Sequence, residues 1–180
     1  MKVIGIDLAG LETNPSGFAI LVDKKFITQT LHTDEQILEH CAAAKPLVVA
    51  IDAPLSFPKR GNLRVADLAL IKSGFRVFPP KFGGMKSLTI RGTKLASKIK
   101  NAKIDVIEVH PRTSGLIIFG TDDRKKWVEE LKRRGYEFKG ETSRHEIDAA
   151  LAALTASLYL EKRTEKIGTP NEGIIIIPRK

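Results

Sequence analysis

Short apolar runs bounded by turn-forming residues alternate along this chain with longer segments whose apolar positions recur at helical spacing. The short runs predict strands over residues 2–8, 17–23, 25–32, 47–52 and 104–110, with a further short strand over 173–178. The longer segments predict helices over residues 34–44, 64–73, 85–101, 122–134 and 144–163. After an opening group of three strands, helical segments therefore separate the remaining strands.

The order of these elements indicates the fold class. The short connection between the second and third strands indicates a hairpin, and the continuous apolar run 47–52 is typical of a strand buried on both faces. We expect an α/β fold whose mixed sheet has five main strands, in the order β-β-β-α-β-α-β-α, with helices on both faces. No repeat or linker interrupts the chain, so residues 1–180 are expected to form one domain. Residues 59–103 would be a basic helical insertion after the fourth strand.

The composition is that of a globular protein, with 42% hydrophobic and 28% charged residues, which excludes a disordered or collagen-like chain. No apolar run approaches the roughly 20 residues that span a bilayer, and no signal peptide is recognisable, so we expect no membrane association. The single cysteine, Cys41, excludes an internal disulfide and is expected to be a buried core thiol. A cytoplasmic location fits these features.

Positive charge is concentrated in one segment. Residues 59–103 contain twelve Lys or Arg and a single acid, Asp67, whereas the rest of the chain holds 18 Lys or Arg and 20 Asp or Glu. Phe75, Phe78 and Phe82 are interleaved with these charges. A focused basic segment favours nucleic acid as a partner. The alternative is a solvated, lysine-rich surface of the kind found in heat-stable proteins.

Two carboxylates stand at the ends of apolar strands. Asp7 interrupts the first run and Asp52 ends the fourth, and each is followed by a turn. A buried charge without a partner is very costly, so each is either paired, hydrogen-bonded or bound to a cation. One such Asp can simply cap a turn. Two at matching strand ends favour a site, because sites in open α/β sheets gather at the carboxyl ends of the strands.

The helix predicted from residue 144 brings further chemistry. Ser143 and Glu146 form a capping box, which gives Glu146 a structural task. His145 and Asp148 are three residues apart and therefore share one face of the first turn. Asp148 is either a helix-N-terminal acid favoured by the helix dipole or a metal ligand beside Asp7.

Glu108 interrupts the predicted strand 104–110, and His110 follows on the same side. One of them is a candidate to support the site. Glu108 can equally neutralise an arginine such as Arg64 or Arg112 within the fold. Carboxylate oxygens without a cysteine cluster suit Mg²⁺ or Mn²⁺. Two such ions about 4 Å apart activate a water and stabilise the leaving oxygen of a phosphodiester.

Four motifs together resemble domain-of-unknown-function family 429, an uncharacterised family described as predicted nucleases of RNase H-like fold. They are GIDLAG…SGFA, AIDAPLSFP…RxxD, VIEVHPRTS and HEIDAALAAL, and they cover nearly the whole chain. The last also resembles the final active-site helix of RuvC-type Holliday-junction resolvases. The resemblance implies metal ligands at Asp7, Asp52 and Asp148, with His145 beside Asp148 as a ligand or proton carrier.

The chain also departs from the RuvC pattern. Asp52 stands where those enzymes usually carry Glu, and segment 59–103 has no counterpart there. By resemblance, Arg64 and Asp67 are a family feature that either contacts substrate or braces the loop as an ion pair.

The preferred hypothesis is a nuclease dependent on Mg²⁺ or Mn²⁺ that hydrolyses DNA or RNA. Lys94, Lys98 and Lys100, together with Arg64, are the candidate substrate-binding residues. A homodimer fits if the substrate is a junction, because two strands need two sites. The alternatives are a non-catalytic nucleic-acid-binding module and an ATP-binding phosphotransfer protein related to actin-like ATPases and sugar kinases. The second alternative is disfavoured because those proteins need two such domains around the nucleotide.

Overall fold

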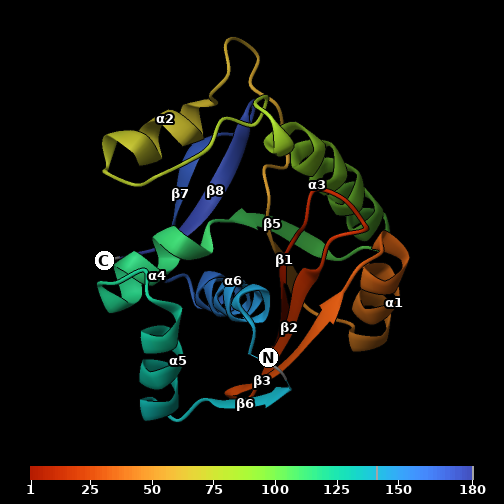
Figure 1. The fold of residues 1–180 in the computed structure, drawn as a ribbon, viewed down its shortest axis with the longest axis vertical. Coiled ribbons are helices and arrows are strands. Elements are labelled where there is room, and N and C mark those ends of the chain that lie inside the picture. The colour runs from red at the N-terminus through yellow and green to blue at the C-terminus, as the bar shows by residue number, and fades with distance from the viewer. Residues whose placement is uncertain (141, 180) are drawn as a thin grey trace.

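The computed structural model describes residues 1–140 and 142–179, which build one twisted eight-stranded sheet flanked by helices (Figure 1). The strands are β1 (Lys2–Asp7), β2 (Ser16–Val22), β3 (Lys25–Leu31), β4 (Val48–Asp52), β5 (Asp105–Val109), β6 (Glu137–Gly140), β7 (Thr164–Thr169) and β8 (Gly173–Pro178). The helices are α1 (Asp34–Ala44), α2 (Val65–Lys72), α3 (Gly84–Asn101), α4 (Pro111–Phe119), α5 (Arg124–Arg133) and α6 (Arg144–Leu160).

The sheet has the order β6-β3-β2-β1-β4-β5-β8-β7. β1, β2 and β3 form an antiparallel meander, and the β2–β3 turn places Asp23 and Lys24 at positive φ, as a tight hairpin requires. β4 and β5 then add in parallel beside β1. The predicted mixed α/β sheet with an opening three-strand group is confirmed in this central part.

The prediction of five main strands is wrong, because the sheet continues at both edges. β6 pairs with β3, and β7 pairs with β8 as a hairpin beside β5. β7 lies in a stretch for which the sequence predicts no element, directly after the helix predicted up to residue 163, and α6 itself ends at Leu160. α4 was also missed. Pro111 suggests the end of a strand, yet here it occupies the first turn of a helix, where its missing N–H is tolerated.

Helices cover both faces of the sheet, as predicted. α6 crosses one face against β1, β2 and β4, and α1 and α3 cover the other (Figure 1). Gly5 permits the close approach of α6, because a Cβ there would collide with the backbone of Ala149 and Ala153. α3 buries Leu95 and Ile99 in the same core as Ile37 and Cys41 of α1. The α3 part of the basic segment therefore belongs to the layer that covers the sheet, and the description of residues 59–103 as an insertion stays a prediction.

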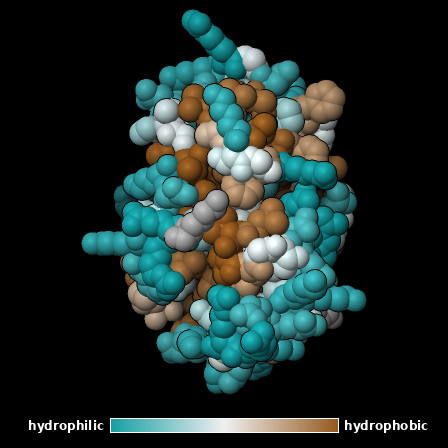
Figure 2. All heavy atoms as spheres, turned by 90° about the vertical axis from the view of Figure 1, so that its left-hand side faces the viewer, coloured by the Kyte–Doolittle hydropathy of each residue, from teal (hydrophilic) through white to brown (hydrophobic). Residues whose placement is uncertain are grey.

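α2 lies away from the main core, against the β7–β8 hairpin, where Ala66 and Leu70 pack on Ile175. The opposite side of α2 is exposed and apolar, with Val65, Leu68 and Ile71 more than 40% exposed. The side of the molecule that carries this hairpin shows an apolar strip framed by hydrophilic side chains (Figure 2).

Among the residues that the structure describes, no helix is long and apolar enough to cross a membrane.

Candidate active site

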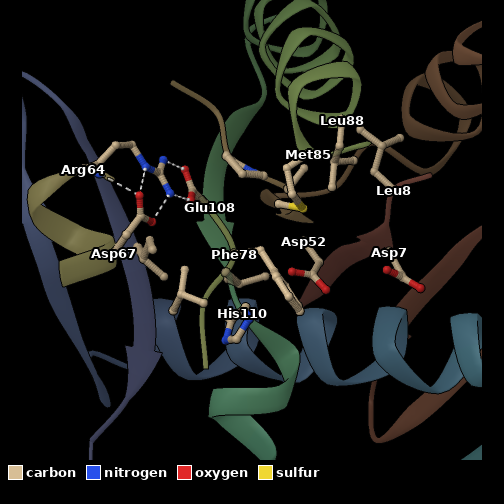
Figure 3. A pocket seen from close by; sticks show the side chains of 15 residues that line it. Asp7, Leu8, Asp52, Arg64, Asp67, Phe78, Met85, Leu88, Glu108 and His110 are labelled. Carbon is tan, nitrogen blue, oxygen red and sulfur yellow. Dashed lines mark hydrogen bonds and ion pairs between the residues drawn. The ribbon is translucent and has the colours of Figure 1, made fainter. Parts of the chain in front are cut away.

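Asp7 and Asp52 are direct neighbours at the carboxyl ends of adjacent parallel strands. β1 and β4 pair with Asp7 opposite Asp52, so the two carboxylates leave the sheet at the same level. Both line a cavity of about 180 Å³ that extends between the strand ends, the N-terminal part of α3 and the loop before it (Figure 3). The apolar residues before each Asp are buried and fix these positions.

The first turn of α6 brings His145 and Asp148 to the same place. The predicted capping box between Ser143 and Glu146 is present and fixes the helix start. Gly17 of β2 lets the helix approach, because a Cβ there would collide with the backbone carbonyl of His145. The His145 ring nitrogen Nδ1 then lies 2.7 Å from Asp7 Oδ2.

Asp148 is not free in this arrangement. Arg124, at the start of α5, donates to both carboxylate oxygens, with Nε 2.8 Å from Oδ1 and Nη2 2.7 Å from Oδ2. Asp148 is buried, whereas the Arg124 side chain is 23% exposed. Sequence reasoning missed Arg124, whose position depends on how α5 docks against α6.

Burial dominates the electrostatics of the site and raises the pKa of its three carboxyl groups. Burial raises the pKa of Asp52 well above 3.8, and the neighbouring charges of Asp7 and Asp148 raise that pKa further. Burial also raises the pKa of Asp7, against the lowering effect of the His145 contact. The pKa of Asp148 is raised by burial as well, despite Arg124. The contacts with Arg124 and His145 therefore do not offset the burial of three carboxylates in a poorly solvated place.

These side chains do not form a ready metal site. Within residues 1–140 and 142–179, no three His, Cys, Asp or Glu side chains converge closely enough to hold a metal ion. The reason is visible in the contacts, since Asp7 faces His145 and Asp148 faces Arg124. The carboxylate of Asp52 makes no hydrogen bond or ion pair with another residue that the structure describes. The predicted ligand set of Asp7, Asp52 and Asp148 stays a prediction.

Arg64 is wrongly predicted as a substrate-binding residue. Its side chain is 1% exposed, and its guanidinium contacts Asp67 Oδ1 at 2.8 Å and Glu108 Oε1 at 2.6 Å. Glu108 also accepts from the backbone N–H of Leu55. The alternative interpretation, an internal ion pair that braces the loop, matches the structure, and Glu108 is fully engaged in it.

His110 lines the same cavity and precedes the first turn of α4. Its Nδ1 lies 2.6 Å from Thr113 Oγ1. Burial, followed by the nearby charge of Arg112, lowers the pKa of His110 to about 4, so the imidazole is neutral at pH 7.

Lys94 and Lys98 are exposed one turn apart on α3 and share a face. Lys100 is exposed too, but it lies beside Tyr159 and Lys166 in a separate groove. The three lysines therefore do not form one surface.

Arg76, Lys81 and Lys86 are exposed in and beside the loop that reaches the cavity, and sequence reasoning did not single them out. Phe78 of that loop lines the cavity while 67% exposed.

Comparison with solved structures places this fold beside RuvC. The structure of Thermus thermophilus RuvC in complex with Holliday junction substrate superposes with a TM-score of 0.59 and 16% identity, over 90% of this chain and 96% of that chain. A second Thermus thermophilus RuvC structure gives a TM-score of 0.55 with the same identity and coverage.

No protein-family model and no curated protein matches the sequence, so the resemblance to family 429 stays a prediction. At this level of identity the likeness establishes the architecture alone, and the chain has a mixed α/β fold similar to that of RuvC.

Proposed function

We propose that this protein is a nuclease of RNase H-like fold that hydrolyses phosphodiester bonds of nucleic acid with the help of Mg²⁺ or Mn²⁺. The observation that carries the proposal is the in-register pair Asp7 and Asp52, joined by His145 and Asp148 from α6. The fold likeness to RuvC, whose structure includes a Holliday junction substrate, supports the same activity class by analogy.

The donor set suits a hard divalent cation. Asp7, Asp52 and Asp148 offer only carboxylate oxygens, and burial raises the pKa of all three, so a bound cation would stabilise their ionised forms. These three residues would hold the ion, with Asp148 leaving Arg124 for it. Such ions, when bound, supply charge that polarises a water and stabilises the leaving oxygen.

The protein's own groups then have separate tasks. Asp7 orients His145 through Nδ1, and the His145 side chain is 46% exposed. Its Nε2 is available to accept a proton from an attacking water. Arg124, once released from Asp148, would offer its guanidinium to a substrate phosphate.

The basic segment supplies the affinity for a polyanion. Ten of its twelve Lys and Arg residues are exposed, and the exceptions are Arg64 and Arg91. Such a surface attracts DNA or RNA regardless of sequence. We keep the homodimer within this proposal, with the exposed apolar face of α2 as its contact surface.

A cleavage assay tests the function. Wild-type protein with Mn²⁺ is expected to cut at least one of a panel comprising single strands, duplexes and four-way junctions of DNA and RNA. Asp7→Asn is expected to lower the rate by more than about 100-fold, since changing even a group behind a metal ligand costs 10–100-fold. Asp23→Asn, in the exposed β2–β3 turn, is the matched control and should cleave normally. Undiminished cleavage by folded Asp7→Asn protein would contradict the site.

A non-catalytic nucleic-acid-binding module is the second candidate. The ion pair of Arg124 with Asp148 favours it, because that contact occupies a carboxylate that catalysis would need. Binding that survives EDTA and Asp7→Asn, with no cleavage of any substrate in the panel, would establish this candidate.

A further inference from the structure

The cavity beside Asp7 and Asp52 has a mostly apolar wall that a cation site does not need. Figure 3 shows Met85 and Leu88 of α3 on one side and His110 on the other, with the carboxylates near its edge. The apolar lining includes Leu8, Pro54, Val77, Met85, Leu88 and Ile175. An apolar cavity of about 150 Å³ takes up benzene, so 180 Å³ accommodates one flat heterocyclic ring.

The rim of the cavity combines an aromatic ring with positive charge. Phe78 lies between Asp52 and His110 in Figure 3 and is 67% exposed, so a ligand can reach its ring. Arg76 and Lys81 are exposed on either side of it in the same loop. A ring that stacks, set between cations, is the arrangement that binds single-stranded nucleic acid.

We propose that this cavity receives one unpaired nucleobase, which stacks on Phe78 while the strand follows Arg76, Lys81 and Lys86. The identity of the ligand as nucleic acid rests on the proposed function. Beyond that function, the proposal states that the substrate carries an unpaired base beside the bond to be cut. A base held here brings its adjoining phosphate toward Asp7 and Asp52.

His110 gives the cavity a polar contact for the edge of the base. Thr113 occupies Nδ1, and no described residue hydrogen-bonds to Nε2. Because the imidazole is neutral at pH 7, Nε2 can exchange a hydrogen bond with a base without placing a charge in the apolar wall. Glu108 is not available for this task, because Arg64 and Leu55 occupy its oxygens.

The test compares two ligands of equal charge, a short oligothymidylate and an abasic oligomer of the same length. Their affinities are measured by fluorescence anisotropy in EDTA, so that the readout does not depend on cleavage. Wild-type protein is expected to prefer the base-bearing oligomer by about fivefold or more, the usual effect of stacking one base. Phe78→Ala should remove this preference.

Phe82→Ala is the matched control, since Phe82 is 73% exposed in the same basic segment but does not line the cavity. It should keep the preference. Leu88→Phe, which fills the cavity and leaves Phe78 in place, should weaken it. Equal affinity of wild-type protein for the two oligomers, or no binding of either, would overturn the proposal. A base preference that depends on Phe78, in a protein that cleaves nothing, would instead contradict the nuclease function alone.

Discussion

Two pairs of acids line the same cavity, but only one pair contacts an arginine. Asp67 and Glu108 share the guanidinium of Arg64, which is buried with them and contacts both. Asp7 and Asp52 stand side by side with no arginine between them, and the charge of Asp7 adds to burial in raising the pKa of Asp52. The first group braces α2 against β5. The second keeps negative charge unbalanced at the strand ends, which favours function over stability.

Arg64, Asp67 and Glu108 form a group whose charges compensate one another, called the compensated group below. Removing its cation is expected to have the largest effect on stability. Arg64→Met leaves Asp67 and Glu108 buried without a counter-charge, and losing one partner of a buried pair costs about 3–5 kcal/mol. We expect this fall in the free energy of unfolding in urea. Arg112→Met, which breaks the exposed pair with Asp122, should change it little. Equal effects of the two variants would contradict the bracing role.

Asp7 and Asp52 form the uncompensated group. Removing a charge from this group should raise stability instead of lowering it. The folded-state pKa of Asp52 lies above its unfolded value, so the folded protein binds this proton more tightly. Ionisation therefore disfavours folding, and stability falls as pH rises from 3.8 through the folded-state pKa. Asp52→Asn should raise the Tm at pH 7, by about 2–4 °C for each kcal/mol regained, and the gain should vanish below about pH 3.8.

Asp67→Asn is the control for that measurement. It removes charge from the compensated group and should lower the Tm at pH 7, because Arg64 is then paired with one carboxylate instead of two. If Asp52→Asn also lowered the Tm, Asp52 would be a structural carboxylate.

The smallest expected effect lies outside both groups. Lys94 and Lys98 share an exposed face of α3. Changing both to Gln should reduce the slope of log affinity against log salt by about 0.9 for each duplex phosphate that the protein no longer neutralises. Lys100→Gln, on a different side of the helix, should leave the slope unchanged. An unchanged slope in the double variant would mean that this face does not touch nucleic acid.

The sequence could predict the positions of those site residues that depend on neighbours in the chain or on strand register. Asp7 and Asp52 end apolar strands, and parallel pairing then places them together. His145 joins them because the capping box fixes where α6 starts. Arg124 could not be predicted, since its contact with Asp148 depends on the docking of one helix on another.

Arg64 illustrates the same limit. Its charge suggested a surface role, whereas only the packing of α2 on the β7–β8 hairpin reveals that it is buried.

Calorimetric titration of Mn²⁺ tests the central claim most directly, with wild-type protein compared with Asp7→Asn and Arg124→Gln. The account predicts binding by the wild type, no binding by Asp7→Asn, and tighter binding by Arg124→Gln, because Asp148 is then free. Failure of both the wild type and Arg124→Gln to bind, or equal binding by the wild type and Asp7→Asn, would contradict a cation site at these carboxylates.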